Sequence, residues 1–235
     1  MTCIAEILER SPLRVLDRSI HGGLGRGDLG VVCSHAGAGK TAFLVGVALD
    51  VLLGGCRALH VALDHPVDRV RNYYDEILAE LCRSEDLEKP AGARLLVERN
   101  RRIHAYQKAA FSVDALTRSL EFLRSHTDVH PELIVVDGYD WSHGTEREIA
   151  SLKNLARSEE AALWMSANLD RGGPAASEGG LPEPLGRYDA VVDVLLRLKG
   201  ADGTVHLSVL KGHGGAAPGS PGLDLDPTTL LLVKR

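Results

Sequence analysis

The stretch "CSHAGAGKTAFL", Cys33–Leu44, decides the fold because it joins the pattern of a strand to the pattern of a helix. The apolar run "LGVVCS" (Leu29–Ser34) predicts a buried strand, and residues 40–53 predict a helix. A glycine-rich turn between the two lets backbone N–H groups and the positive end of the helix dipole face an anion. The sequence therefore predicts a phosphate-binding loop at this junction.

The residues of this loop follow the pattern G-x-x-x-x-G-K-[ST], except that Ser34 stands at the first glycine. Lys40 would place a charge near the β- and γ-phosphates, and Thr41 would bind Mg²⁺ through its hydroxyl. The predicted nucleotide contacts are His35, Ala36, Gly37, Ala38, Gly39, Lys40, Thr41 and Ala42. The alternative is a glycine-rich turn that precedes a helix beginning with lysine.

A second apolar run, "ELIVVDGYD" (Glu132–Asp140), supplies an acidic residue where a strand should end. A phosphate-binding loop of this kind needs such a carboxylate for its metal ion, and Asp137 stands at the right place. We therefore predict a Mg²⁺ site at Thr41 and Asp137. The alternative for Asp137 is an ordinary residue that ends a strand.

Apolar runs and amphipathic stretches alternate along most of the chain, which predicts an α/β fold with a parallel sheet between helices. From residue 188 onwards only strand patterns follow, so we expect antiparallel strands to extend a sheet of about five parallel strands. We expect one domain over residues 1–235, with an N-terminal extension (1–20) and a mobile loop (172–187). The other predicted segments are strands at 58–63, 162–167, 190–198, 204–210 and 228–233, helices at 66–82, 112–125 and 145–159, and an exposed connection at 84–94.

Composition excludes several classes of protein. The chain has 235 residues, 44% of them hydrophobic, but its apolar runs are too short for a membrane helix and its start has no secretory pattern. We therefore expect a cytoplasmic protein. Its four cysteines lack disulfide or zinc spacing, and its net charge of −5 gives no general attraction to nucleic acid.

The stretch "GGLGRGDLGVVCSHAGAGKTAFLVGVA" (Gly22–Ala48) resembles the first strand, P-loop and helix of the RecA-like ATPases. The resemblance is closest to the ATPase domain of DnaB-type hexameric helicases and to KaiC-like proteins. "ALHVALDHP", "LIVVDGYD" and "YDAVVDVLLRL" match later parts in the same order, so the resemblance covers about residues 14–234. It implies an ATPase with ATP and Mg²⁺ as cofactors, assembled as a hexameric ring or filament of identical subunits.

The resemblance also implies further catalytic residues, and the sequence departs from the family at Asp64 and at His213, two residues after Lys211. Asp64 stands where the family has a water-activating glutamate, and a general base displaced by about 1 Å can slow a reaction on the order of 10²-fold. Asn168 is the best substitute for the family's γ-phosphate sensor, ahead of Ser166. Lys211 would reach a neighbouring subunit's nucleotide. The family has a Lys-x-Arg pair at this place, and His213 stands here at the position of the arginine. Slow hydrolysis is therefore expected.

Each of these residues also has a simpler interpretation. Asp64 could cap a helix before Pro66, Asn168 could be a hydrogen-bonding residue at a strand end, and Lys211 could be an exposed turn lysine. The basic stretch "RLLVERNRRIHAYQK" (Arg94–Lys108) could bind nucleic acid or an acidic partner, but a solvated face is the preferred interpretation.

Three functions remain open on the sequence. We favour an oligomeric ATPase whose nucleotide state controls assembly or a protein partner. A nucleic-acid-dependent ATPase of the helicase or recombinase type is disfavoured because residues 172–185 contain no Lys or Arg. The third function is a weakly active nucleotide-binding scaffold, which the departures at Ser34, Asp64 and His213 motivate.

Overall fold

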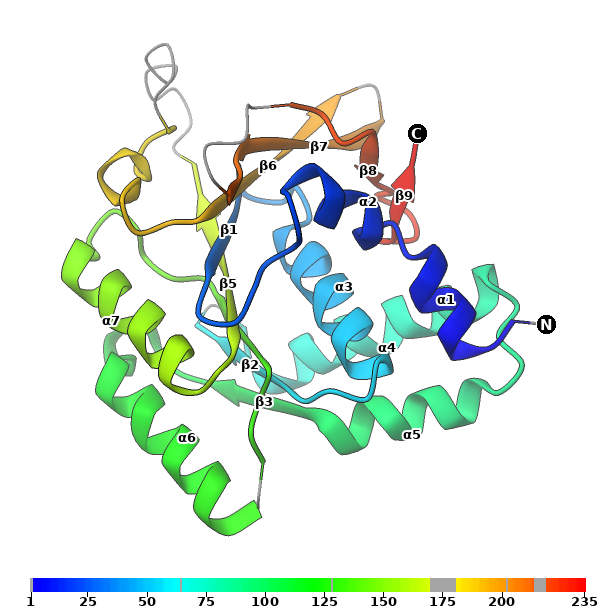
Figure 1. The fold of residues 1–235 in the computed structure, drawn as a ribbon, viewed down its shortest axis with the longest axis horizontal. Coiled ribbons are helices and arrows are strands. Elements are labelled where there is room, and N and C mark those ends of the chain that lie inside the picture. The colour runs from blue at the N-terminus through cyan, green and yellow to red at the C-terminus, as the bar shows by residue number, and fades with distance from the viewer. Residues whose placement is uncertain (1, 64, 128, 170–180, 202, 214–218) are drawn as a thin grey trace.

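A single sheet organises the molecule (Figure 1). The computed structural model describes the whole chain apart from residues 1, 64, 128, 170–180, 202 and 214–218. In the described residues, nine strands follow the order β3-β2-β4-β5-β1-β6-β7-β8-β9. The strands are β1 (Leu29–Ser34), β2 (Ala58–Ala62), β3 (Arg101–Ala105), β4 (Leu133–Asp137), β5 (Ala162–Asn168), β6 (Val194–Ala201), β7 (Thr204–Lys211), β8 (Leu223–Leu225) and β9 (Leu232–Lys234).

The sheet is parallel from β3 to β6 and antiparallel from β6 to β9. The expected α/β class, with a mostly parallel sheet and an antiparallel C-terminal portion, is therefore confirmed. Because parallel strands run the same way, β1, β2, β4 and β5 all end at one edge of the sheet, which we call the carboxyl edge. Functional groups in such sheets commonly lie at this edge.

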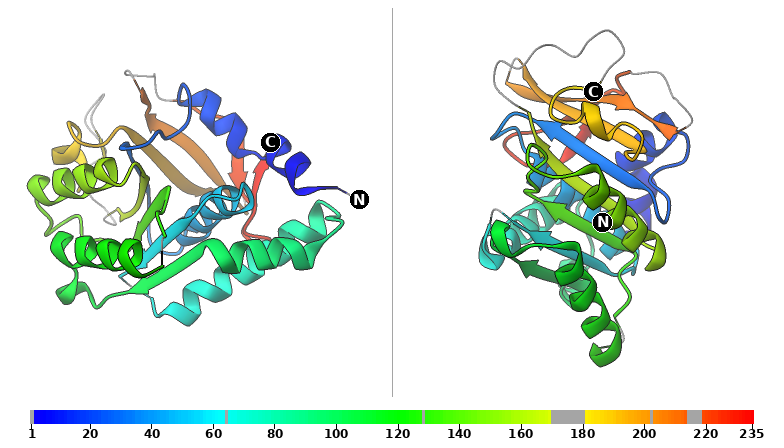
Figure 2. Two further views of the ribbon diagram at one scale, coloured as in Figure 1. Left: turned by 60° about the horizontal axis from the view of Figure 1, so that its bottom comes forward. Right: turned by 90° about the vertical axis from the view of Figure 1, so that its left-hand side faces the viewer.

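Helices cover both faces of the sheet (Figure 2). The first five helices pack on one face and belong to one hydrophobic core, and the last two pack on the other face with a second core. The helices are α1 (Ile4–Arg10), α2 (Leu13–Ser19), α3 (Lys40–Leu53), α4 (Val67–Ser84), α5 (Pro90–Asn100), α6 (Val113–Thr127) and α7 (Glu146–Ser158). Two short 3-10 helices, η1 (Lys108–Ala110) and η2 (Gly186–Tyr188), complete the described elements.

Central strand β1 shows how sequence fits position. All of its residues are buried, so its continuous apolar run is the pattern expected for a strand covered on both faces. A Cβ on Gly30 would lie 2.7 Å from the Trp164 ring on β5, so a glycine is required where the indole crosses β1. Helix α7 begins with a capping box, in which the Thr145 hydroxyl accepts from Glu148 N while the Glu148 carboxylate accepts from Thr145 N.

One expectation about the connections is wrong. We expected residues 84–94 to be an exposed connection, but α5 begins at Pro90 and buries Ala93. Proline is tolerated at the first helical position because its missing N–H has no partner inside the helix there. The proline that indicated a loop therefore begins a helix.

The basic stretch Arg94–Lys108 covers the second half of α5 and the edge strand β3, and its interpretation as a solvated face is wrong for Arg101. The Arg101 side chain is only 4% exposed, lies over the Tyr74 ring at 4.8 Å, and bonds Glu98. Arg102 donates to the carbonyls of Arg99 and Arg101. Two of the basic residues are therefore engaged in holding the structure together.

The strands near the end of the chain also differ from the expected ranges. Strand β6 begins at Val194, because the preceding residues form η2 and a turn. Strand β9 begins only at Leu232, since the Asp226 carboxylate accepts bonds from Thr228 N and Thr229 N and bends the backbone. Strand β8 was not expected as a separate element. Of the predicted loop at 172–187, residues 172–180 lie outside the described residues, and Leu185 at its other end is buried.

The helices of the described part of the chain include none that is both long enough and apolar enough to cross a membrane.

Candidate functional site

The segment between β1 and α3, His35–Gly39, forms a turn that we call the Gly-rich loop. Gly37 and Gly39 have φ angles of 85° and 89°, in the left-handed region that residues with a Cβ rarely adopt. A Cβ on Gly39 would lie 2.3 Å from Leu225 Cδ2 of strand β8. The backbone angle therefore favours glycine at position 39, and a larger residue there would also displace the end of the Leu225 side chain.

The Lys40 side chain folds back across the Gly-rich loop. Its ammonium donates to Ser34 Oγ at 3.1 Å and to the carbonyls of Ser34 and His35 at 3.4 and 3.2 Å. His35 Nδ1 lies 3.2 Å from the carbonyl of Leu169, just beyond β5. These contacts hold a cation over a turn that begins a helix, which is the arrangement that favours an anion.

Thr41 and Asp137 are brought together as the sequence predicts. Thr41 lies in the first turn of α3 and Asp137 ends β4, and the Thr41 hydroxyl donates to Asp137 Oδ2 at 2.7 Å. Asp137 is 6% exposed, so its carboxylate is held beneath the start of the helix. The contact follows from the packing of α3 across β1, β5 and β4.

Ser166 joins Thr41 and Asp137 in one hydrogen-bonded cluster. The sequence favours Asn168 over Ser166 as the γ-phosphate sensor. The Ser166 hydroxyl donates to Asp137 Oδ1 at 2.5 Å and accepts from Gly138 N at 2.8 Å. Val136 pairs with Met165 across β4 and β5, so the next residues, Asp137 and Ser166, are neighbours on one face. The sequence shows that Ser166 lies near the end of a predicted strand. It does not show that this strand lies beside β4, which is what brings Ser166 to Asp137.

Of the two other residues predicted for the carboxyl edge, Asn168 and Asp64, the structure describes only Asn168. Asn168 pairs in register with Ser34, so it lies beside the start of the Gly-rich loop with its side chain exposed. Asp64 lies outside the described residues. Leu63, which follows β2, donates its N–H to the Asp137 carbonyl. Leu63 therefore lies at the same edge of the sheet as Asp137.

Lys211 and His213 lie at the opposite edge. Lys211 pairs with Leu195, which pairs with Val31 in the first half of β1, so β7 ends toward the amino edge of the parallel strands. Lys211 Nζ donates to the backbone carbonyl and carboxylate of Asp189 at 2.5 and 2.8 Å. His213 Nε2 lies 2.9 Å from the carbonyl of Gly23. The structure therefore does not bring Lys211 to the Gly-rich loop of its own chain.

Two titratable side chains in the strands beneath the site are kept neutral. Burial raises the pKa of the Cys33 thiol to about 12. Burial lowers the pKa of His60 to about 4, although the charge of Asp137 opposes this shift. His60 Nδ1 lies 3.2 Å from the Tyr74 hydroxyl, and its buried Nε2 has no hydrogen-bond partner. At neutral pH both groups are uncharged.

The chemistry of the cluster fits Mg²⁺ better than a softer metal. Thr41 and Asp137 offer oxygen atoms, and Mg²⁺ usually binds one or two protein oxygens with its remaining positions taken by water and phosphate. Within the described ranges, no group of three or more His, Cys, Asp or Glu side chains is arranged to hold a metal ion. Comparison of the chain with models of known protein families and with curated proteins found no match.

Proposed function

We propose that this protein is a RecA-like ATPase that binds Mg²⁺-ATP at the Gly-rich loop and acts as an oligomer. The observation that carries the proposal is the hydrogen bond from Thr41 to Asp137, two residues almost a hundred positions apart. The local patterns of the sequence predict the same two residues as metal ligands. A strand-to-helix turn with two left-handed glycines and a lysine across it supports the phosphate half of the site.

In this proposal each residue of the site has a separate role in binding or hydrolysing the nucleotide. Backbone N–H groups of residues 35–42 and the Lys40 ammonium hold the phosphates, and Thr41 and Asp137 hold Mg²⁺, which neutralises phosphate charge when bound. Asn168 senses the γ-phosphate from the strand end beside the loop, and Asp64 orients the attacking water. Lys211 serves the nucleotide of a neighbouring subunit. Nucleotide state then controls assembly or a protein partner.

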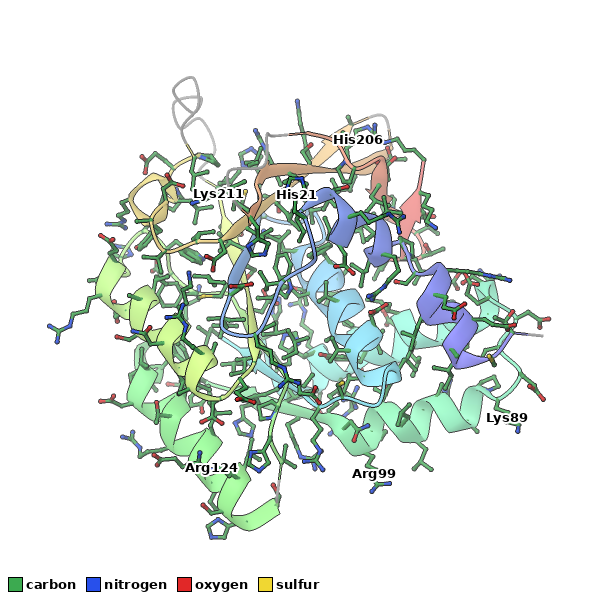
Figure 3. The ribbon with its side chains drawn as sticks, viewed as in Figure 1. His21, Lys89, Arg99, Arg124, His206 and Lys211 are labelled. Carbon is green, nitrogen blue, oxygen red and sulfur yellow. The ribbon has the colours of Figure 1, made fainter. Side chains whose placement is uncertain are left out.

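A nucleic-acid-dependent ATPase is less well supported. The basic stretch that would contact phosphates loses Arg101 to a buried position and Arg102 to backbone carbonyls. Arg99 still points away from the body of the molecule, as Figure 3 shows, so a weak electrostatic contact remains available. A nucleotide-binding scaffold without turnover is the stronger second candidate, because Lys211 and His213 are engaged within their own chain.

The first experiment measures ATP binding and ATP turnover against protein concentration, with and without single-stranded DNA. We expect Mg²⁺-dependent binding, and slow turnover per subunit that rises with concentration and ignores DNA. The Lys40→Ala variant should lose most of its ATP affinity, while Lys199→Ala, an exposed lysine on β6, should keep it. Equal binding by the parent and Lys40→Ala would overturn the proposal. Binding without turnover at every concentration would favour the scaffold.

A further inference from the structure

We propose that Ser166 is a positioning residue that holds the Asp137 carboxylate in the orientation needed for Mg²⁺. The inference rests on the proposed function, because it concerns the metal half of the same site. Asp137 has two carboxylate oxygens with different partners: Oδ2 accepts from Thr41 and Oδ1 accepts from Ser166. With Oδ1 occupied, the rotation of the carboxylate is set and Oδ2 faces the start of α3.

The Ser166 hydroxyl is suited to this task because both of its hydrogen-bonding roles are filled. It donates to Asp137 Oδ1 at 2.5 Å and accepts from Gly138 N at 2.8 Å. At 2% exposure, the residue has no solvent competing for these bonds. One hydroxyl thus fixes the side chain of Asp137 and the backbone that follows it.

The backbone after Asp137 is held to the same serine a second time. Trp141 Nε1 donates to the Ser166 carbonyl at 2.7 Å, so residues 138–141 close a loop onto β5. The carbonyl of Trp141 in turn accepts from the Tyr188 hydroxyl at 2.8 Å, as does the carbonyl of Gly144. Tyr188 is therefore linked to Asp137 indirectly, because it bonds Trp141, Trp141 bonds Ser166, and Ser166 bonds Asp137.

Groups that orient a metal ligand typically change metal affinity by 10- to 100-fold when they are removed. Among the described residues, the bonds of the Lys40 ammonium go to Ser34 and His35 and those of the Ser166 hydroxyl go to Asp137 and Gly138, so phosphate binding without metal should be independent of Ser166. A purely structural role would weaken both kinds of binding together. The separation of the two affinities therefore distinguishes positioning from folding.

The test measures binding of a fluorescent ATP analogue to the full chain during a MgCl₂ titration, and again in EDTA. For Ser166→Ala we expect the half-saturating Mg²⁺ concentration to rise about tenfold or more, with unchanged affinity in EDTA. Ser166→Thr keeps the hydroxyl and should recover most of the Mg²⁺ dependence. Ser208→Ala, on β7 away from the site, is the matched control and should match the parent.

A second variant protects the test against misfolding of Ser166→Ala. Tyr188→Phe removes only a hydroxyl and should raise the Mg²⁺ requirement in the same sense by a smaller factor. Parental Mg²⁺ dependence in a folded Ser166→Ala protein, or in Tyr188→Phe if Ser166→Ala does not fold, would overturn the inference. Equal weakening with Mg²⁺ and in EDTA would overturn it as well. Failure of the proposed function is distinct, since the parent itself would then bind no ATP analogue.

Discussion

At the scale of the residue, Gly39 combines two constraints that usually occur apart. Its φ of 89° disfavours most side chains by backbone strain, and a Cβ there would also have to displace the end of the Leu225 side chain. Gly37 has nearly the same φ, 85°, but a Cβ there would meet nothing within 4 Å. A substitution at Gly37 would therefore meet backbone strain alone, whereas one at Gly39 would meet backbone strain and the contact with Leu225.

We predict that Gly39→Ala lowers the free energy of unfolding more than Gly37→Ala does. The left-handed conformation alone costs an alanine roughly 1–2 kcal/mol at either position, and only position 39 adds the collision with Leu225. Urea unfolding of the two variants measures the difference. The double variant Gly39→Ala, Leu225→Ala should cost less than the sum of its single changes, because the second change removes the collision. Additive costs would show that Leu225 does not press on the loop.

The candidate site could be predicted in part from single residues. Thr41 and Asp137 each follow from a local pattern, a helix start after a glycine-rich turn and an acidic strand end, and the fold brings them into contact. Ser166 could not be selected, because its role depends on β5 lying beside β4, and strand order is not written in any local pattern. The role of Asp64 stays a prediction.

At the scale of the element, β2 and α4 enclose an imidazole that stays neutral. His60 is completely buried in β2 and meets the Tyr74 ring of α4 edge-on. The charges that act on it are Asp137, which raises its pKa, and Arg101 and His65, which lower it together with burial. The net result is a folded-state pKa of about 4, below the usual histidine value of 6.5.

This depressed pKa predicts a pH dependence of stability. Between pH 6.5 and about 4 the unfolded chain binds a proton at His60 that the folded chain does not, so the free energy of unfolding falls as the pH falls. The loss can reach about 3 kcal/mol at the lower end of this window. Urea unfolding between pH 7 and 4.5 measures this dependence. The free energy of unfolding of His60→Phe should fall less steeply with falling pH than that of the parent. His126→Gln, an exposed histidine of α6, should keep the parental slope.

The elements whose limits the sequence predicted are those with a strong local signal. The predicted limits of β1 and α3 match the structure, because an uninterrupted apolar run and a glycine-ended helix leave little choice. Strand β3 was missed because Arg101 and Arg102 look like surface residues, whereas Tyr74, Asp75 and Glu98 make a buried arginine tolerable. A partner supplied by tertiary packing cannot be read from the charged residue itself.

At the scale of the whole molecule, the two halves of the proposed chemistry lie at opposite edges of the sheet. The Gly-rich loop follows the end of β1, while Lys211 is level with the first half of β1 and bonds Asp189 ahead of β6. One chain cannot bring Lys211 to its own Gly-rich loop without rearranging the sheet. If Lys211 contributes to turnover, it must do so between subunits.

This separation predicts complementation between inactive chains. Lys40→Ala and Lys211→Ala should each turn over ATP far more slowly than the parent. A mixture should regain part of the turnover, because some contacts between subunits then pair an intact Gly-rich loop with an intact Lys211. Steady-state turnover of the mixture, against each variant alone at the same total concentration, measures the effect. A mixture no faster than the average of its components would exclude Lys211 as a shared residue.

The contact between Leu225 and Gly39 also has a consequence for how the protein is made. The Gly-rich loop leaves the ribosome well before the strand that packs on it, which is translated almost two hundred residues later. Nascent chains that end before β8 lack the leucine that closes over the loop. The Gly-rich loop of a partly made chain should therefore be held less firmly than that of the finished chain.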